Sequence, residues 1–313
     1  FSGTAYWFDG DTEGKWISST YYMQQLPEWV EKYNQSGKTA SFLKPWTTLY
    51  DIKTYTASGT DDNPYEGVFK GEERPVFPHD LPKLSAYGND LTKDFALALL
   101  ENEKLGKGSH PDFLAISFSS TDYVGHQFGV NSVEIEDTYL RLDQNLEEIL
   151  NALDRQVGKG NYVVFLTADH GAVHVPAFLQ ENKMAAGYFD SSAFRKELKS
   201  FMTKEFGTDS LYLNASNDQI FLNHEVMKKH DLEKDDVEEI LVDFLLNQPD
   251  IAEAYTATAM QNAQFTEGTA ALLQRGFNPK RSGDVLFSLN PATISYPRTG
   301  STHGSGYNYD THV

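Results

Sequence analysis

The chain has 313 residues, of which 40% are hydrophobic, enough to bury the core of one large domain or of a domain with an inserted lobe. The formal net charge is -19, which argues against nucleic acid as a partner because like charges repel. The absence of cysteine excludes thiolate zinc sites, disulfides and a cysteine nucleophile. No run of about 18 apolar residues occurs, so the sequence predicts no membrane span.

The two ends predict a piece of a longer protein. The chain begins Phe1-Ser2-Gly3, without an initiator methionine or a signal peptide, and its last residues, from Tyr309 to Val313, are typical of a strand that is just starting. Any targeting segment is therefore expected ahead of Phe1.

The first hundred residues predict a hairpin, a short helix, a long loop and a long helix. Thr4 to Ile17 reads as two short strands around a turn rich in glycine and aspartate, and a helix follows from Pro27 to Tyr33. Residues 51–88 are rich in glycine and proline, which predicts a loop. Apolar residues at helical spacing then predict a helix over Asp90 to Leu105.

Two apolar runs in the middle of the chain predict strands buried on both faces. They are Phe113 to Phe118 (FLAISF) and Tyr162 to Leu166 (YVVFL). Between them, apolar residues at steps of four and three predict a long helix over Val133 to Val157, and Asn131 with Glu134 gives its start signal. This order of helix, strand, helix and strand favours an α/β fold with a doubly wound, mostly parallel sheet flanked by helices.

After Pro176 the predicted elements become shorter and mixed. Helices are expected over Ser192 to Phe206 and Leu232 to Asn247. The strand candidates are Leu211 to Asn214, Gln219 to Leu222, Asp250 to Ala257 and Val285 to Leu289. The pattern predicts a smaller α+β lobe over 180–283, inserted into a metal-binding α/β core formed by 1–179 and 284–313.

Metal-type ligands lie in predicted loops that follow both predicted central strands. Asp122 and His126 come after the first strand, Asp169 and His170 come after the second, and His303 lies in a later loop rich in glycine. Because the carboxyl ends of parallel strands meet at one edge of a sheet, the first four are expected to converge. Carboxylate and imidazole groups suit zinc, and five ligands exceed the needs of one tetrahedral site. The set therefore favours two metal ions close together.

Simpler interpretations apply to some of these residues and to their neighbours. Asp169 with His170, taken alone, also fits an aspartate that caps a turn beside an incidental histidine. His174 is interpreted as a partly exposed loop residue. The hydroxyls of residues 119–121 lie near the expected site, but nothing marks one of them as a nucleophile. Four other histidines are expected at the surface: His79, His110, His224 and His230.

Three motifs in this order and at these separations resemble the alkaline phosphatase superfamily. They are TADHG at 167–171, TDYVGHQFG at 121–129 and THG at 302–304. The chain is most similar to the phosphate-irrepressible (PafA-type) bacterial alkaline phosphatases, and the resemblance runs over nearly its whole length. It implies an alkaline phosphatase-like fold in which one zinc ion is held by Asp122, His126 and His303 and the second zinc ion binds Asp169 and His170.

The resemblance also implies a function. It implies a zinc-dependent phosphomonoesterase, with two zinc ions per complete active site, that hydrolyses small-molecule phosphate esters through a covalent phospho-Thr or phospho-Ser intermediate. The nucleophile, a further zinc-binding aspartate and the side chains that grip the phosphoryl oxygens are expected upstream of Phe1, so the isolated chain is expected to lack the nucleophile. A periplasmic or secreted location is implied as well.

Two alternative functions remain open at this stage. One is a phosphodiesterase or nucleotide pyrophosphatase of the same superfamily. The side chains that grip the phosphoryl oxygens would distinguish it from a phosphomonoesterase, but they are missing from this chain. The other is a non-catalytic binding module in which metals only hold loops together. A structural zinc site is closed by four protein ligands, whereas Asp122, His126 and His303 supply three, which favours catalysis. A sulfatase is disfavoured, because its modified cysteine has no counterpart in this chain.

Overall fold

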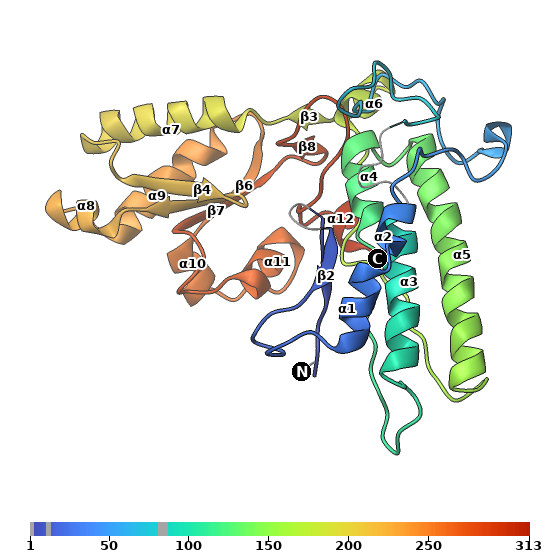
Figure 1. Ribbon diagram of the computed structural model, residues 1–313. Helices are drawn as coiled ribbons and strands as arrows, with labels where there is room; N and C mark the ends of the chain where they lie inside the picture. The colour runs from blue at the N-terminus through green and yellow to red at the C-terminus, as the bar shows by residue number, and fades with distance from the viewer. Residues whose placement is uncertain (1–2, 11–13, 81–86) are drawn as a thin grey trace. The chain divides into compact units, whose positions relative to one another are not determined.

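The computed structural model describes residues 3–10, 14–80 and 87–313. The chain divides into two compact units, Phe1–Leu166 and Thr167–Val313. Figure 1 colours the first unit from blue to green and the second from yellow-green to red. Each unit has hydrophobic clusters of its own, so each packs around separate cores.

The first unit opens with the predicted hairpin. Strand β1 (Trp7–Asp9) pairs antiparallel with β2 (Lys15–Ile17), while residues 11–13 of the expected turn lie outside the described residues. The predicted helix after Pro27 is confirmed as α1 (Glu28–Gln35). Two short helices follow, α2 (Lys38–Ser41) and the 3₁₀ helix η1 (Ile52–Thr54). Apart from η1, residues 51–80 form the irregular segment that their composition predicts, and residues 81–86 are outside the description.

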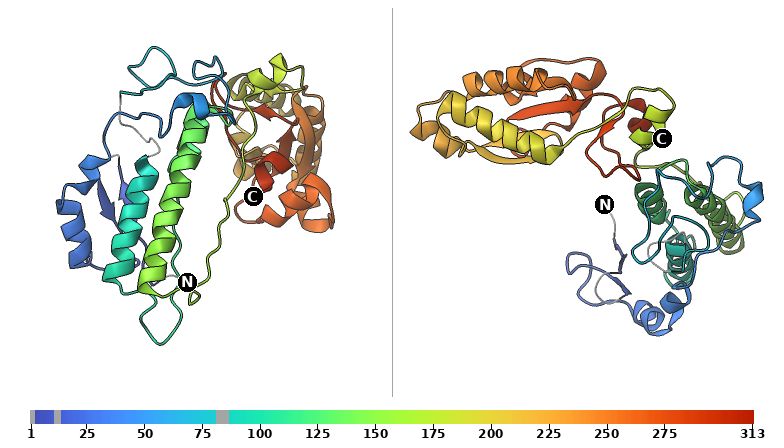
Figure 2. Two further views of the ribbon diagram at one scale, coloured as in Figure 1. Left: turned by 90° about the vertical axis from the view of Figure 1, so that its right-hand side faces the viewer. Right: turned by 90° about the horizontal axis from the view of Figure 1, so that it is seen from above.

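Three further helices belong to the first unit. They are α3 (Tyr87–Asn102), α4 (Ser120–Phe128) and α5 (Val133–Gln156). Helix α5 packs against both α3 and α4, and Figure 2 shows α3 and α5 side by side. The long helices follow from their apolar periodicity. Helix α4 lies where the sequence predicts a loop after the first central strand, so the structure corrects that prediction.

Helix α5 begins at Val133, as predicted, but its N-cap lies one residue after the predicted start signal, Asn131. The N-cap is Ser132, whose hydroxyl oxygen accepts a hydrogen bond from the backbone N–H of Ile135 at 3.1 Å. The same hydroxyl donates to the carbonyl oxygen of Gly129 at 3.0 Å. This serine therefore fixes both the helix start and the end of α4 before it.

Neither of the two apolar runs that predict buried strands is buried in this structure. Phe113 is 88% exposed, Val163 79% and Phe165 85%. Neither run belongs to a strand in the part of the chain that the structure describes. The prediction of two buried strands is wrong for these segments, because an apolar run becomes a strand only where a neighbouring strand pairs with its backbone.

A four-stranded antiparallel sheet forms the core of the second unit. Its strands run in the order β4 (Tyr212–Ser216), β5 (Gln219–Leu222), β7 (Val285–Leu289) and β6 (Ile251–Thr256). Helices α7 (Ser191–Phe206) and α9 (Lys234–Leu246) pack on this sheet (Figure 1). Leu198 of α7 and Leu241 of α9 are fully buried against Ile220 and Phe287 in one cluster, which confirms both predicted helices and the predicted strand pair.

Smaller elements surround this sheet. Strand β3 (Gly187–Tyr188) pairs parallel with β8 (Thr293–Ile294). The short helices are α6 (Pro176–Glu181), α8 (His224–Lys229), α10 (Ala257–Asn262), α11 (Gly268–Gly276) and α12 (Asn308–Thr311). The predicted lobe boundaries at 180 and 283 stay a prediction, and β7 belongs to the same sheet as β4 to β6. Over the described ranges, no helix is both long and apolar enough to cross a membrane.

Candidate metal centre

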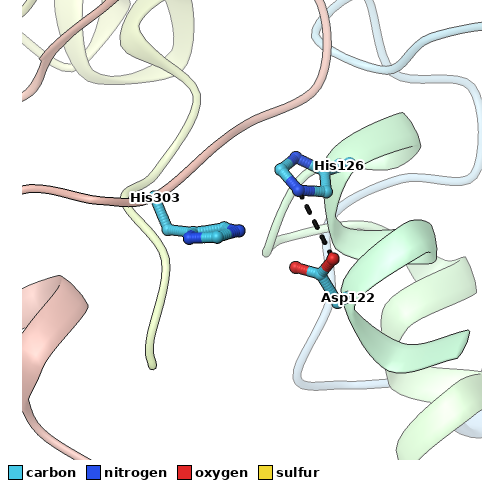
Figure 3. Close-up of side chains that lie close together, drawn as sticks. All are labelled: Asp122, His126 and His303. Atoms are coloured by element: carbon cyan, nitrogen blue, oxygen red, sulfur yellow. Dashed lines mark ion pairs between the residues drawn. The ribbon is translucent and has the colours of Figure 1, made fainter. Parts of the chain in front are cut away.

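Helix α4 presents two of the predicted ligands on one face. Asp122 and His126 are four residues apart, so their side chains lie one above the other. The Nε2 atom of His126 lies 3.4 Å from a carboxylate oxygen of Asp122 (Figure 3). Both side chains are partly exposed, while Val124 and Phe128 on the opposite side of the helix are buried. The apolar face therefore anchors α4 and leaves the polar face open.

The start of α4 is held by a buried asparagine that sequence analysis missed. Asn89 of α3 accepts a hydrogen bond from the backbone N–H of Ser120 at 3.2 Å. Its amide nitrogen donates to the hydroxyl of Thr121 at 3.1 Å. Asn89 is fully buried, and it ties α3 to the turn that carries Asp122. No local sequence pattern marks it, because the contact joins segments about 30 residues apart.

In the second unit, His170 and His303 lie against each other. Their ring centroids are 3.4 Å apart and the rings are nearly parallel, at 15°. The Nδ1 atom of His170 lies 2.9 Å from the carbonyl oxygen of Gly171. A proton on Nδ1 makes this contact a hydrogen bond and leaves Nε2 with the lone pair that binds a metal. Nε2 faces Asp169 at 3.7 Å, and the Asp169 side chain is 91% exposed.

A buried aspartate shapes the loop that carries His303. One carboxylate oxygen of Asp310 in α12 accepts hydrogen bonds from the backbone N–H of Gly304 at 3.0 Å and of Ser305 at 2.8 Å. The hydroxyl of Ser305 donates to the same oxygen at 2.7 Å. Asp310 is 4% exposed, so these bonds form where water competes little. Asp310 was not singled out from the sequence, and it positions the loop next to a predicted ligand.

The same helix holds the segment that carries Asp169 and His170. The backbone N–H of Gly171 donates to the carbonyl oxygen of Asp310 at 2.7 Å. A Cβ atom at position 171 would lie 2.2 Å from the carbonyl oxygen of Tyr309. Only glycine permits this approach of the two backbones. Helix α12 is therefore the common support for both ligand-bearing segments of the second unit.

The structure thus groups the five predicted ligands within their own units. Asp122 and His126 form one pair in the first unit, and Asp169, His170 and His303 lie together in the second. The assignment of individual residues to individual zinc ions stays a prediction.

Comparison with known proteins identifies the family. Residues 2–309 match the family model of the type I phosphodiesterases and nucleotide pyrophosphatases, and the chain belongs to this family within the alkaline phosphatase superfamily. The superfamily predicted from the three motifs is confirmed.

Individual relatives are similar over essentially the whole chain. It is 43% identical to a protein named calcium-transporting ATPase from Myroides odoratus, 38% identical to alkaline phosphatase PafA from Elizabethkingia meningoseptica and 40% identical to alkaline phosphatase PhoV from Synechococcus elongatus. These matches cover 100%, 99% and 99% of this chain, but 60%, 59% and 58% of the relatives. The chain therefore spans about three fifths of the length of the relatives it matches.

A solved structure of PafA shares the fold. The wild-type crystal structure superposes with a TM-score of 0.91 at 37% identity, covering 98% of this chain and 61% of that one. This match confirms the predicted fold class, an alkaline phosphatase-like α/β fold.

Proposed function

We propose that this chain carries most of the metal-binding part of a zinc-dependent alkaline phosphatase that hydrolyses phosphate monoesters. In this proposal Asp122, His126 and His303 bind one zinc ion, and Asp169 and His170 bind the second (the first set is labelled in Figure 3). Family membership and the names of PafA and PhoV support the reaction class. The observation that carries the metal assignment is the pairing of Asp122 with His126 on one open helix face.

The donor set fits zinc. Each of Asp122, His126 and His303 supplies one oxygen or nitrogen ligand atom, and three protein ligands leave a position open for substrate or water. The contact between His170 Nδ1 and the Gly171 carbonyl favours the tautomer that presents Nε2 to a metal. Manganese or cobalt would accept the same ligands, but mixed imidazole and carboxylate sets suit zinc best.

Bound zinc would supply Lewis acidity, which lowers the pKa of an attacking hydroxyl and stabilises the charge on the leaving oxygen. The residues of this chain would fix the ligand positions. Asn89 braces the first turn of α4 before Asp122, and Asp310 holds the loop that carries His303. The nucleophile of the proposed phospho-Thr or phospho-Ser intermediate is not assigned to any of the 313 residues. A periplasmic or secreted location is part of the proposal.

Substrate preference separates this proposal from a phosphodiesterase. We expect the complete gene product to hydrolyse 4-nitrophenyl phosphate with a higher kcat/KM than bis(4-nitrophenyl) phosphate. A preference for the diester would favour the phosphodiesterase or nucleotide pyrophosphatase alternative instead. No turnover of either ester, with zinc still bound, would favour a metal-stabilised binding module.

Substitution of His126 tests the metal assignment directly. His126→Gln in the complete gene product should lower kcat/KM for the monoester by about 100-fold or more and reduce the zinc content, because the substitution removes a ligand. His110→Gln is the matched control, since His110 is exposed in the same unit and is not a proposed ligand. Equal activity and equal zinc content in both variants would contradict the role of His126.

A further inference from the structure

Two buried glutamates of the first unit have carboxylate oxygens without hydrogen-bond partners. Glu66 is 3% exposed, and both of its carboxylate oxygens are buried and unbonded within residues 3–10, 14–80 and 87–313. Glu134, in the first turn of α5, is fully buried. Its Oε2 atom likewise has no hydrogen-bond partner among the residues that the structure describes. A buried carboxylate without partners is costly, so these three oxygens call for a compensating group.

The surroundings of these oxygens are strongly acidic. Burial, followed by the charges of Glu134, Asp61 and Asp62, raises the pKa of Glu66 to about 10. Arg74 is paired with Asp62 and also favours the ionised form of Asp61, so its charge is shared between these two carboxylates. These carboxyl groups therefore lie close enough together to disfavour one another's ionised forms, and Glu66 is neutral at pH 7 unless a cation is bound.

A buried histidine that contacts Glu134 has hydrogen-bond partners at both ring nitrogens. His79, predicted to be at the surface, is completely buried. Its Nδ1 atom lies 2.8 Å from Glu72, and its Nε2 atom lies 3.0 Å from Oε1 of Glu134. These two carboxylates favour the imidazolium and outweigh burial, so the pKa of His79 is raised. Because both ring nitrogens are occupied, this histidine is not available as a metal ligand.

Protonation alone does not satisfy Glu66. A neutral carboxyl group has one O–H donor and a carbonyl acceptor, and both would stay unbonded in a buried environment. A small cation bound between Glu66 and Glu134 would give a partner to all three unbonded oxygens. The available ligands are all oxygens, which suits a hard cation rather than zinc.

We propose that Glu66 and Glu134 bind a hard divalent cation, with Ca²⁺ as the best match. Two carboxylates are fewer ligands than Ca²⁺ takes, and water and backbone carbonyl oxygens ordinarily complete such a shell. The ion would join the irregular segment 56–80 to the start of α5. The segment is also tied to α4, since the backbone N–H of Gly67 donates to the carbonyl oxygen of Gln127 at 2.8 Å. Its role would be to hold this segment in place, separate from the proposed zinc chemistry.

Thermal unfolding of the 313-residue chain in CaCl₂ and in EDTA tests the site. Millimolar Ca²⁺ should raise the Tm of the wild-type chain by about 2–4 °C or more, because the ion binds only the folded state. Glu66→Gln should abolish this shift and be about as stable as wild type in EDTA, because the raised pKa of Glu66 keeps its carboxyl group neutral when no ion is bound. Glu73→Gln is the matched control: Glu73 is exposed in the same segment, and this variant should keep the full shift.

Terbium luminescence gives a readout that does not depend on the stability of a variant. Tb³⁺ replaces Ca²⁺ at oxygen sites, and the indole of Trp46 lies 5.5 Å, between ring centroids, from the His79 ring. Sensitised emission that Ca²⁺ displaces, present in wild type and in Glu73→Gln and lost in Glu66→Gln, is the expected result. Absence of Ca²⁺-displaceable emission in wild type, or a Tm shift that survives in Glu66→Gln, would overturn the proposal.

Discussion

Asp218 lies in a tight turn and has a backbone conformation that is strained for a residue other than glycine. Asn217 and Asp218 connect β4 to β5, and both have positive φ angles, 50° and 55°. Two such residues form the tight hairpin turn whose twist matches the strands. The backbone N–H of Phe287 donates to the carbonyl oxygen of Asp218, so the turn is also tied to β7. The carboxyl group is partly buried at this position, and this burial raises the pKa of Asp218 to about 6.

The raised pKa predicts a pH-dependent stability. The folded state binds the proton more tightly than the unfolded state, whose aspartate pKa is near 3.8. The carboxyl therefore destabilises the fold progressively as the pH rises from about 4 to about 6, and fully above that. Asp218→Asn should stabilise the chain by ~2 kcal/mol at pH 8 and by much less at pH 4, as measured by urea unfolding. Asp209→Asn, at an exposed position, should show no such difference, and an equal gain for both variants would contradict this cause.

At the scale of elements, sequence patterns predict the long helices and miss contacts made at a distance. The periodicity of residues 133–157 predicts α5 correctly, because its buried face repeats along the helix. Helix α4 was missed because it is short and includes Gly125, and because long-range packing of Val124 and Phe128 stabilises it. His79 looked like a surface residue for the same reason. Its burial depends on Glu134, 55 positions away.

The cap of α5 gives an element-scale prediction. Ser132→Ala removes the hydrogen bond from the Ile135 N–H to the cap, and it should cost about 1 kcal/mol of unfolding free energy. Ser119, at the N-cap of α4, makes no side-chain cap hydrogen bond, so Ser119→Ala is the matched control and should cost less. Urea unfolding followed by circular dichroism measures both values. A larger loss for the control would show that the Ser132 bond does not set the stability of this helix start.

At the scale of the whole molecule, the superfamily was predictable and part of the sheet was not. Three motifs around Asp122, Asp169 and His303 identify the superfamily, because each motif is a short stretch of sequence that includes a predicted metal ligand. Pairing of the apolar runs at 113–118 and 162–166 requires neighbouring strands, which no local pattern can supply. The antiparallel sheet of the second unit was predictable in part, since β4 and β5 are adjacent in sequence.

The zinc content of the purified chain tests the central claim most directly. The chain is dialysed against metal-free buffer, and its zinc is counted by elemental mass spectrometry. The proposal predicts about one zinc ion per chain from Asp122, His126 and His303, and about two if Asp169 and His170 also retain theirs. His126→Gln should lose the first ion, and His110→Gln should lose none. A chain that retains no zinc, or that keeps its zinc unchanged in His126→Gln, would contradict the metal centre proposed for this protein.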